Sequence, residues 1–131
     1  HELGKVSYGI YCGERHRLFR EASPPMEEIL RHSFVAPPPE DDEVWPRHLA
    51  RDVGMVVGDL SLAANVCAAG ELLALLPDPV ARAWSGDGML RRLPMEIGGL
   101  RGVYAVHREL PGPQGPTAAL VDLLRDEMKR I

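Results

Sequence analysis

The order of apolar and polar positions along the chain predicts strands that alternate with short helices. The clearest unit runs from Val56 to Pro77: a strand end, a polar turn, a helix that stops at Gly70, an apolar strand and a proline. Asp59 or Ser61 is expected to cap this helix, since their side-chain oxygens accept backbone N–H groups at helix starts. The following strand lacks polar alternation, which is typical of a strand covered on both faces. The pattern predicts a β-α-β unit.

The same patterns extend to the rest of the chain. Further strands are expected at Lys5–Cys12, Phe34–Ala36, Val53–Val57, Met89–Leu93 and Gly102–His107. Helices are expected from Ser23-Pro24, from Asp78-Pro79, and as an amphipathic last helix over 117–131, with a helical turn over 45–51. Alternating strands and helices predict an α/β fold, a three-layer α/β/α lobe with a mostly parallel sheet.

Length, charge and cysteine content narrow the class of protein. A chain of 131 residues with a formal net charge of −4 fits one globular domain and lacks the positive field that would hold a phosphate backbone. The most apolar window, 60–77, is interrupted and too short to span a bilayer, so no membrane segment is expected. Cys12 and Cys67 are far apart and are expected to be reduced apolar residues, with a disulfide between them left open. The start at His1 without Met indicates a fragment or a processed product.

A ligand site is expected beside the β-α-β unit. In such units the crevice lies outside the carboxyl ends of the strands, where the helix N-terminus offers free N–H groups that suit carboxylates. We therefore expect a ligand near Gly58 to Ser61 and near Leu76 to Asp78. The alternative, that Asp59 and Ser61 only cap a helix and that Pro37–Pro39 only end a strand, stays open.

Six short motifs, in this order, resemble the C-terminal half of the effector-binding domain of LysR-type transcriptional regulators. They are His16-Arg-Leu-Phe19, Phe34-Val-Ala-Pro-Pro38, the strand and helix over 56–70, Gly70-Glu-Leu-Leu-Ala-Leu-Leu-Pro77, Leu90-Arg-Arg-Leu-Pro94 and Val103-Tyr-Ala-Val-His-Arg108. Two positions depart from the family pattern: Arg17 stands where the family often has proline, and Glu71 where it has a small residue.

The resemblance implies the second lobe of a two-lobed domain similar to a type II periplasmic binding protein. Residues 1–110 would form this lobe with its crossover strands, and the helix in 111–131 would normally pack on the absent first lobe. A small, organic-acid-like effector would bind between the lobes. The effector-facing residues on this side would be Pro38, Pro39, Asp59, Leu60, Ser61, Leu76 and Pro77.

The resemblance also implies the setting of the parent protein. It would be a cytoplasmic homo-oligomer that contacts DNA only through an N-terminal helix-turn-helix domain absent here. Neither a membrane nor a cofactor is implied. Without its usual lobe, the last helix would expose Val121, Leu124, Met128 and Ile131, so self-association or an altered docking of this helix is expected.

Other sites are weaker in the sequence. The histidines at 16, 32, 48 and 107 are scattered without metal-ligand spacing, and the acidic run Glu40–Glu43 lacks the alternation of a calcium loop, so no metal site is expected. No nucleophile elbow, phosphate-binding loop or paired catalytic carboxylates are present, so the chain is not expected to be an enzyme. Two alternatives stay open: a lobe of an extracytoplasmic solute receptor, and a small α/β enzyme that uses the same crevice.

Overall fold

A computed structural model describes residues 2–84, 86, 88–98, 100–106 and 116–130, and these divide into two compact units. The larger unit covers 8–99, and the smaller one combines 1–7 with 100–131. The strand β1 (Glu2–Gly13) runs through both units. His107, at the end of an expected strand, and Ile131, at the end of the expected last helix, lie outside the described residues.

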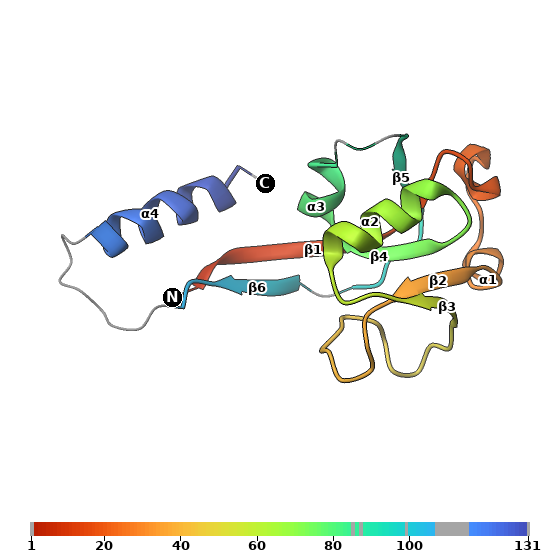
Figure 1. The fold of residues 1–131 in the computed structure, drawn as a ribbon, viewed down its shortest axis with the longest axis horizontal. Coiled ribbons are helices and arrows are strands. Elements are labelled where there is room, and N and C mark those ends of the chain that lie inside the picture. Colours follow the sequence, from red (N-terminus) through yellow and green to blue (C-terminus); the bar gives the residue numbers. More distant parts are fainter. Residues whose placement is uncertain (1, 85, 87, 99, 107–115, 131) are drawn as a thin grey trace. The chain divides into compact units, whose positions relative to one another are not determined.

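The larger unit is built on a sheet in which strand order differs from chain order (Figure 1). Its strands are β2 (Ser33–Ala36), β3 (Asp52–Val56), β4 (Leu73–Pro77), β5 (Leu90–Arg92) and the second half of β1, in the order β3-β2-β4-β1-β5. The predicted β-α-β unit is confirmed as β3, α2 (Leu60–Ala69) and β4. Because β2 lies between β3 and β4, the helix crosses over one strand.

The sheet is mixed, whereas the sequence predicted a mostly parallel one. β2 pairs in parallel with both β3 and β4, but β1 is antiparallel to β4 and β5. Register pairs Tyr8 with Pro77 and Ile10 with Leu75. Strand–helix alternation correctly predicted the parallel part, because a β-α-β crossover requires it. It could not predict the direction of β1, which enters the sheet from the smaller unit.

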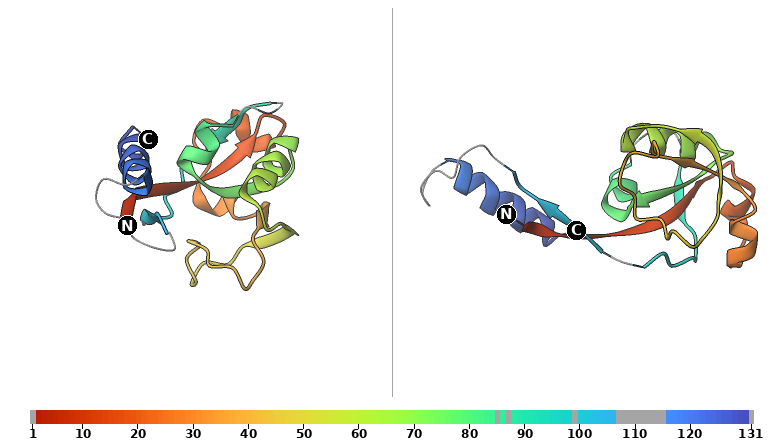
Figure 2. Two further views of the ribbon diagram at one scale, coloured as in Figure 1. Left: turned by 60° about the vertical axis from the view of Figure 1, so that its left-hand side comes forward. Right: turned by 90° about the horizontal axis from the view of Figure 1, so that it is seen from below.

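Both faces of this sheet are covered, as the α/β/α prediction requires. On one face Val35, Ala74 and Leu76 pack with Ala64 and Cys67 of α2, while α3 (Asp78–Arg82) contributes Ala81. Figure 2 shows the ribbons of α2 and α3 beside the sheet. On the other face Phe34 and Leu73 pack with residues from η1 (Arg17–Arg20) and α1 (Met26–Ile29). β4 is buried along its whole length, which explains its unbroken apolar sequence.

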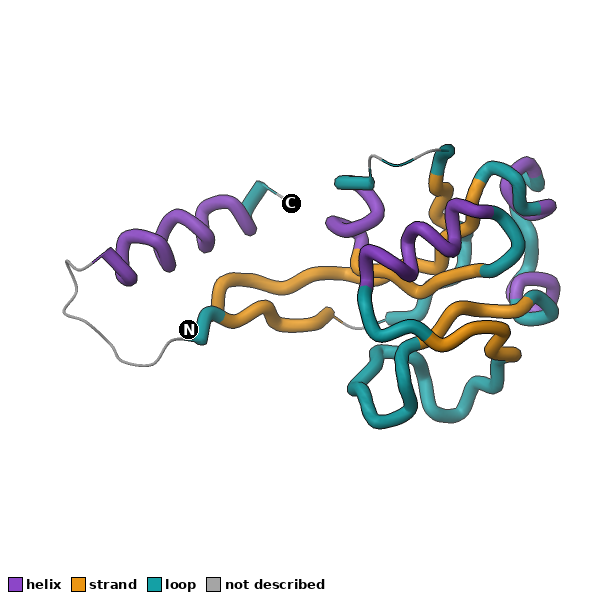
Figure 3. The backbone as a smooth tube through the Cα atoms, viewed as in Figure 1, coloured by secondary structure: helices purple, strands orange, loops and turns teal. Residues whose placement is uncertain are grey.

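Several predicted boundaries change. Residues 45–51 form non-helical turns and bends rather than the expected helical turn, and the tube drawing shows this stretch as loop (Figure 3). Trp45 Nε1 donates to the Leu49 carbonyl at 2.7 Å, a side-chain contact that replaces a helical one. The α1 helix begins at Met26 after Pro25, so Ser23 is not its cap. Gly70 ends α2 with φ at 131°, a conformation that favours glycine, as predicted.

The smaller unit consists of two antiparallel strands and the last helix. The first half of β1 pairs antiparallel with β6 (Leu100–Tyr104), with Lys5 opposite Gly102. In α4 (Pro116–Met128), Val121 is 7% exposed, and the Met128 side chain lies against Gly4. The predicted last helix is therefore confirmed, and within this unit it packs on β1.

Candidate ligand-binding site

The predicted site residues gather where three parallel strands end. We call this place the carboxyl edge; it is formed by the ends of β2, β3 and β4 and by the segments that follow them. Val57 N donates to the Ala36 carbonyl at 3.0 Å, which ties the start of the proline segment to the segment before α2. A Cβ built on Gly58 would lie 4.0 Å from Pro38 Cγ. The turn that precedes α2 therefore lies against Pro38.

Of the two expected candidates, Asp59 is the N-cap of α2. Its Oδ1 accepts from Leu62 N at 3.0 Å, and its carbonyl accepts from Ala63 N at 2.9 Å. The N–H groups of Leu60 and Ser61 precede the first helical hydrogen bond and have no partner among the described residues. These two exposed residues supply the free donors that a ligand could use.

Leu76 and Pro77 are placed differently from the other predicted residues. Leu76 is 0% exposed and belongs to the core below α2, and Pro77 is also buried. Pro38 is half-buried, while Pro39 and Asp59 are exposed. Contact with a ligand is thus open to the proline segment and the start of α2, whereas Leu76 offers no exposed side chain.

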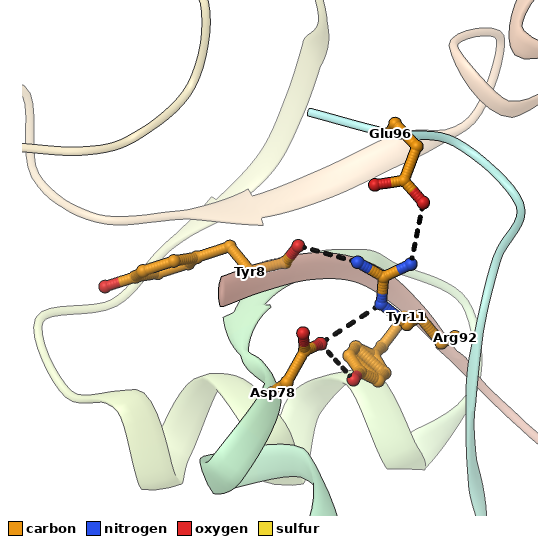
Figure 4. A network of polar contacts seen from close by, with 5 residues as sticks. All are labelled: Tyr8, Tyr11, Asp78, Arg92 and Glu96. Atoms are coloured by element: carbon orange, nitrogen blue, oxygen red, sulfur yellow. Dashed lines mark hydrogen bonds and ion pairs between the residues drawn. The ribbon is translucent and has the colours of Figure 1, made fainter. Parts of the chain in front are cut away.

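A polar network follows directly after β4 and was not foreseen from the sequence (Figure 4). Asp78 Oδ1 accepts from the Tyr11 hydroxyl at 2.5 Å and from Arg92 Nε at 3.1 Å. Arg92 Nη2 donates to the Tyr8 carbonyl at 3.0 Å, and Nη1 donates to Glu96 Oε1 at 3.2 Å. Asp78 was predicted as the start of a helix and as part of a stretch near a ligand, but its pairing was not predicted, because its partners are 67 and 14 positions away in the chain.

The electrostatics of this network favour the protonated forms of Tyr11 and Arg92. Burial, with the hydrogen bond to Asp78, raises the pKa of Tyr11 to about 12, so the phenol remains a donor. Burial works to lower the pKa of Arg92, but hydrogen bonds to Asp78 and Glu96 outweigh it and raise that pKa. A permanent positive charge is therefore held beside the end of β4.

A second arginine, Arg51, anchors the loop that follows Pro38 and Pro39. The guanidinium of Arg51 lies 4.3 Å from the centre of the Trp45 ring, and its side chain is 9% exposed. It also pairs with Glu43. The acidic run Glu40–Glu43 is therefore partly used in packing, because Glu43 neutralises a buried cation.

A groove between α2 and α3 contains one of the predicted residues. It has a volume of about 510 Å³ and is lined by Ser61, Ala64 and Asn65 on one side and by Val80, Ala83 and Trp84 on the other. Ser61 therefore borders both the carboxyl edge and this groove.

The histidines and cysteines have structural positions. The rings of His16 and His32 are 4.7 Å apart, and His16 Nδ1 accepts from Leu18 N at 3.0 Å. In the described part of the chain, no three His, Cys, Asp or Glu residues are grouped so that they could hold a metal ion. Cys12 and Cys67 are free, buried thiols on opposite faces of the sheet, and burial raises their pKa values to about 11 and about 12. The disulfide left open by the sequence is absent.

The family model described as the LysR substrate binding domain matches residues 1–129. The chain belongs to this family, as its motifs predicted. Comparison with curated proteins gave no match. No helix in the described residues is long and apolar enough to cross a membrane.

Solved structures share the fold at low sequence identity. A putative transcriptional regulator from Vibrio parahaemolyticus is 15% identical with a TM-score of 0.68, and the match covers 99% of this chain and 64% of that one. A probable transcriptional regulator from Pseudomonas aeruginosa is 22% identical with a TM-score of 0.62, covering 72% of this chain and 34% of that one. The effector binding domain of QuiR, in complex with shikimate, is 11% identical with a TM-score of 0.63, covering 98% and 64%. The chain spans less than two thirds of the length of each of these three proteins.

Proposed function

We propose that this chain is a sensing lobe of a DNA-binding transcriptional regulator, and that a small organic acid binds at its carboxyl edge against a second lobe. The observation that carries this proposal is the pair of unused N–H groups at Leu60 and Ser61, beside the proline segment. Such groups at a helix start attract carboxylates. Family membership supports a regulatory rather than a catalytic role.

The charge at the carboxyl edge limits which effectors could bind there. Asp59 already places one exposed carboxylate at the start of α2. The Asp59 carboxylate would repel an effector with several negative charges more strongly than an effector with one. An effector with a single carboxylate and neutral hydroxyl groups therefore fits this edge better. Shikimate, which the QuiR domain binds, has this composition.

In the parent protein, binding would change the closure of the two lobes and so reposition DNA-binding domains in a cytoplasmic homo-oligomer. An upstream reading frame that encodes a helix-turn-helix followed by a long helix is expected. An upstream secretory signal would instead favour a solute receptor.

Replacing Leu60 by proline tests the helix start directly. Proline removes one free N–H but is tolerated at the first helical position, and the extended backbone of Asp59 suits a residue that precedes proline. In the complete two-lobed domain, L60P is expected to weaken shikimate binding about tenfold by calorimetry, because a hydrogen bond to a charged group is lost.

Leu60→Ala is the matched control, since it removes the same exposed side chain but keeps the N–H. L60A should bind as the unaltered domain does. Equal affinities for L60P and L60A would remove the helix start from the site.

A further inference from the structure

Arg92 lies across the backbone of β1 at a position that requires glycine. A Cβ built on Gly9 would lie 2.4 Å from Arg92 Nε and 2.9 Å from Arg92 Cγ. Only the absence of a side chain at residue 9 lets the guanidinium reach the Tyr8 carbonyl and Asp78 together. The arginine is thus held in a defined orientation.

Two of the three guanidinium nitrogens point to fixed partners. Asp78 holds Nε, and its side chain is 13% exposed and also accepts from Tyr11. The Tyr8 carbonyl, part of a paired strand, holds Nη2. These contacts orient Arg92 before any ligand arrives, which reduces the entropy that binding would cost.

The third nitrogen has a weaker partner. Arg92 Nη1 pairs with Glu96, whose side chain is 80% exposed. An exposed ion pair of this kind contributes little to stability, because water screens it and both side chains lose freedom. A different carboxylate could take the place of Glu96 at small cost.

The Arg92–Glu96 pair lies near the carboxyl edge. Arg92 donates to the Tyr8 carbonyl, and in the sheet register Tyr8 is opposite Pro77, at the end of β4. We propose that Arg92 is a carboxylate-binding residue of this lobe and that Glu96 is a built-in substitute which a ligand carboxylate displaces. The inference rests on the proposed function, since it names a receptor for the same class of effector.

The surroundings of Arg92 leave room for a ligand and add positive charge. Arg92 also borders a hollow of about 440 Å³, together with Tyr11, Arg82 and Trp84. Arg82 is close enough to Tyr11 to lower the pKa of its phenol, against the larger effect of burial. Arg92 and Arg82 both line this hollow, and Arg92 is oriented there by Asp78 and the Tyr8 carbonyl.

The test uses the ¹⁵N-labelled chain with propionate as the probe and propionamide as its neutral control at fixed ionic strength. NMR titration follows the Arg92 Nε–H and the Gly9 amide. Glu96→Gln removes the competing carboxylate and should bind propionate about two- to fivefold more tightly, the range expected from an exposed ion pair. E127Q makes the same change of charge at the exposed Glu127–Arg130 pair and should leave the affinity unchanged.

Arg92→Gln should abolish the propionate shifts, whereas R130Q should retain them. Melting curves show whether the R92Q variant is folded. If it is unfolded, the propionate affinity of E96Q decides the test, because Glu96 is exposed and its replacement should not disturb folding. Equal affinities for E96Q and E127Q, or propionate shifts that persist in folded R92Q, would overturn the assignment.

The amides of Leu60 and Ser61 report on the proposed function separately. Shifts at these amides but not at Arg92 would keep the helix-start site and overturn the Arg92 site. Shifts at Arg92 alone would support the Arg92 site without the helix start, and shifts at neither would overturn both.

Discussion

At the scale of single residues, three arginines hold segments of the larger unit together. Arg51 stacks on Trp45 and pairs with Glu43, Arg91 donates to backbone carbonyls, and Arg92 joins Asp78 to β1. A planar guanidinium with five donors suits such positions, where lysine would supply a single point of charge. Sequence patterns found none of these roles, since each depends on partners that only the fold brings near.

His16 gives the larger unit a dependence on pH. Burial, then the charges of His32 and Arg17, lower its pKa from 6.5. As pH falls below about 6.5, the unfolded chain takes up this proton first, so stability is full above that pH and decreases toward the lowered folded-state pKa. The free energy of unfolding, measured by urea titration, should therefore fall between pH 7 and pH 5.

Replacing His16 by asparagine should flatten this decrease, because its amide oxygen can accept from Leu18 N without titrating. H48N is the control at an exposed histidine and should keep the decrease. An unchanged pH profile in H16N would contradict the role given to His16.

At the scale of elements, the short helices depend on tertiary contacts. Four-residue elements such as η1 and α1 are too short to be stable alone. Arg91 Nη1 donates to the carbonyls of Leu18, Phe19 and Glu21 at 2.8, 2.9 and 2.5 Å, and so links η1 to β5.

Arg91→Ala should therefore destabilise the chain by about 1–3 kcal/mol in urea unfolding, since several buried or half-buried carbonyls lose a charged donor. R20A, at an exposed arginine of the same segment, should change stability by less than about 0.5 kcal/mol. Equal losses in the two variants would show that Arg91 does not anchor η1.

At the scale of the whole molecule, the smaller unit has more apolar surface than its own strands and helix cover. Leu120 and Leu123 of α4 are 54% and 58% exposed, and Leu100 and Tyr104 of β6 are 62% and 61% exposed. Burial of such surface is favourable, and we expect the isolated chain to self-associate through it.

The double variant L120E/L123E should weaken this association about tenfold or more, measured by sedimentation equilibrium, because two charged side chains would have to be buried. A119E adds one charge at another exposed position of α4 and should have a smaller effect. A chain that stays monomeric at every concentration, with fast amide exchange along α4, would contradict the expectation.

The sequence by itself determined the elements whose signals are local. The cap at Asp59, the stop at Gly70 and the apolar run of β4 were all predictable, because each depends on hydrogen bonds within a turn or on burial of consecutive residues. The family was also predictable, because its motifs are short stretches in a fixed order.

Tertiary structure decided what depends on distant partners. The antiparallel direction of β1 and the Asp78–Arg92 pair both depend on strand pairing between residues far apart in the chain. Local patterns specify which residues avoid water, but not which strand lies beside them. The candidate site is divided in the same way: its helix start was visible in the sequence, and its oriented arginine required the fold.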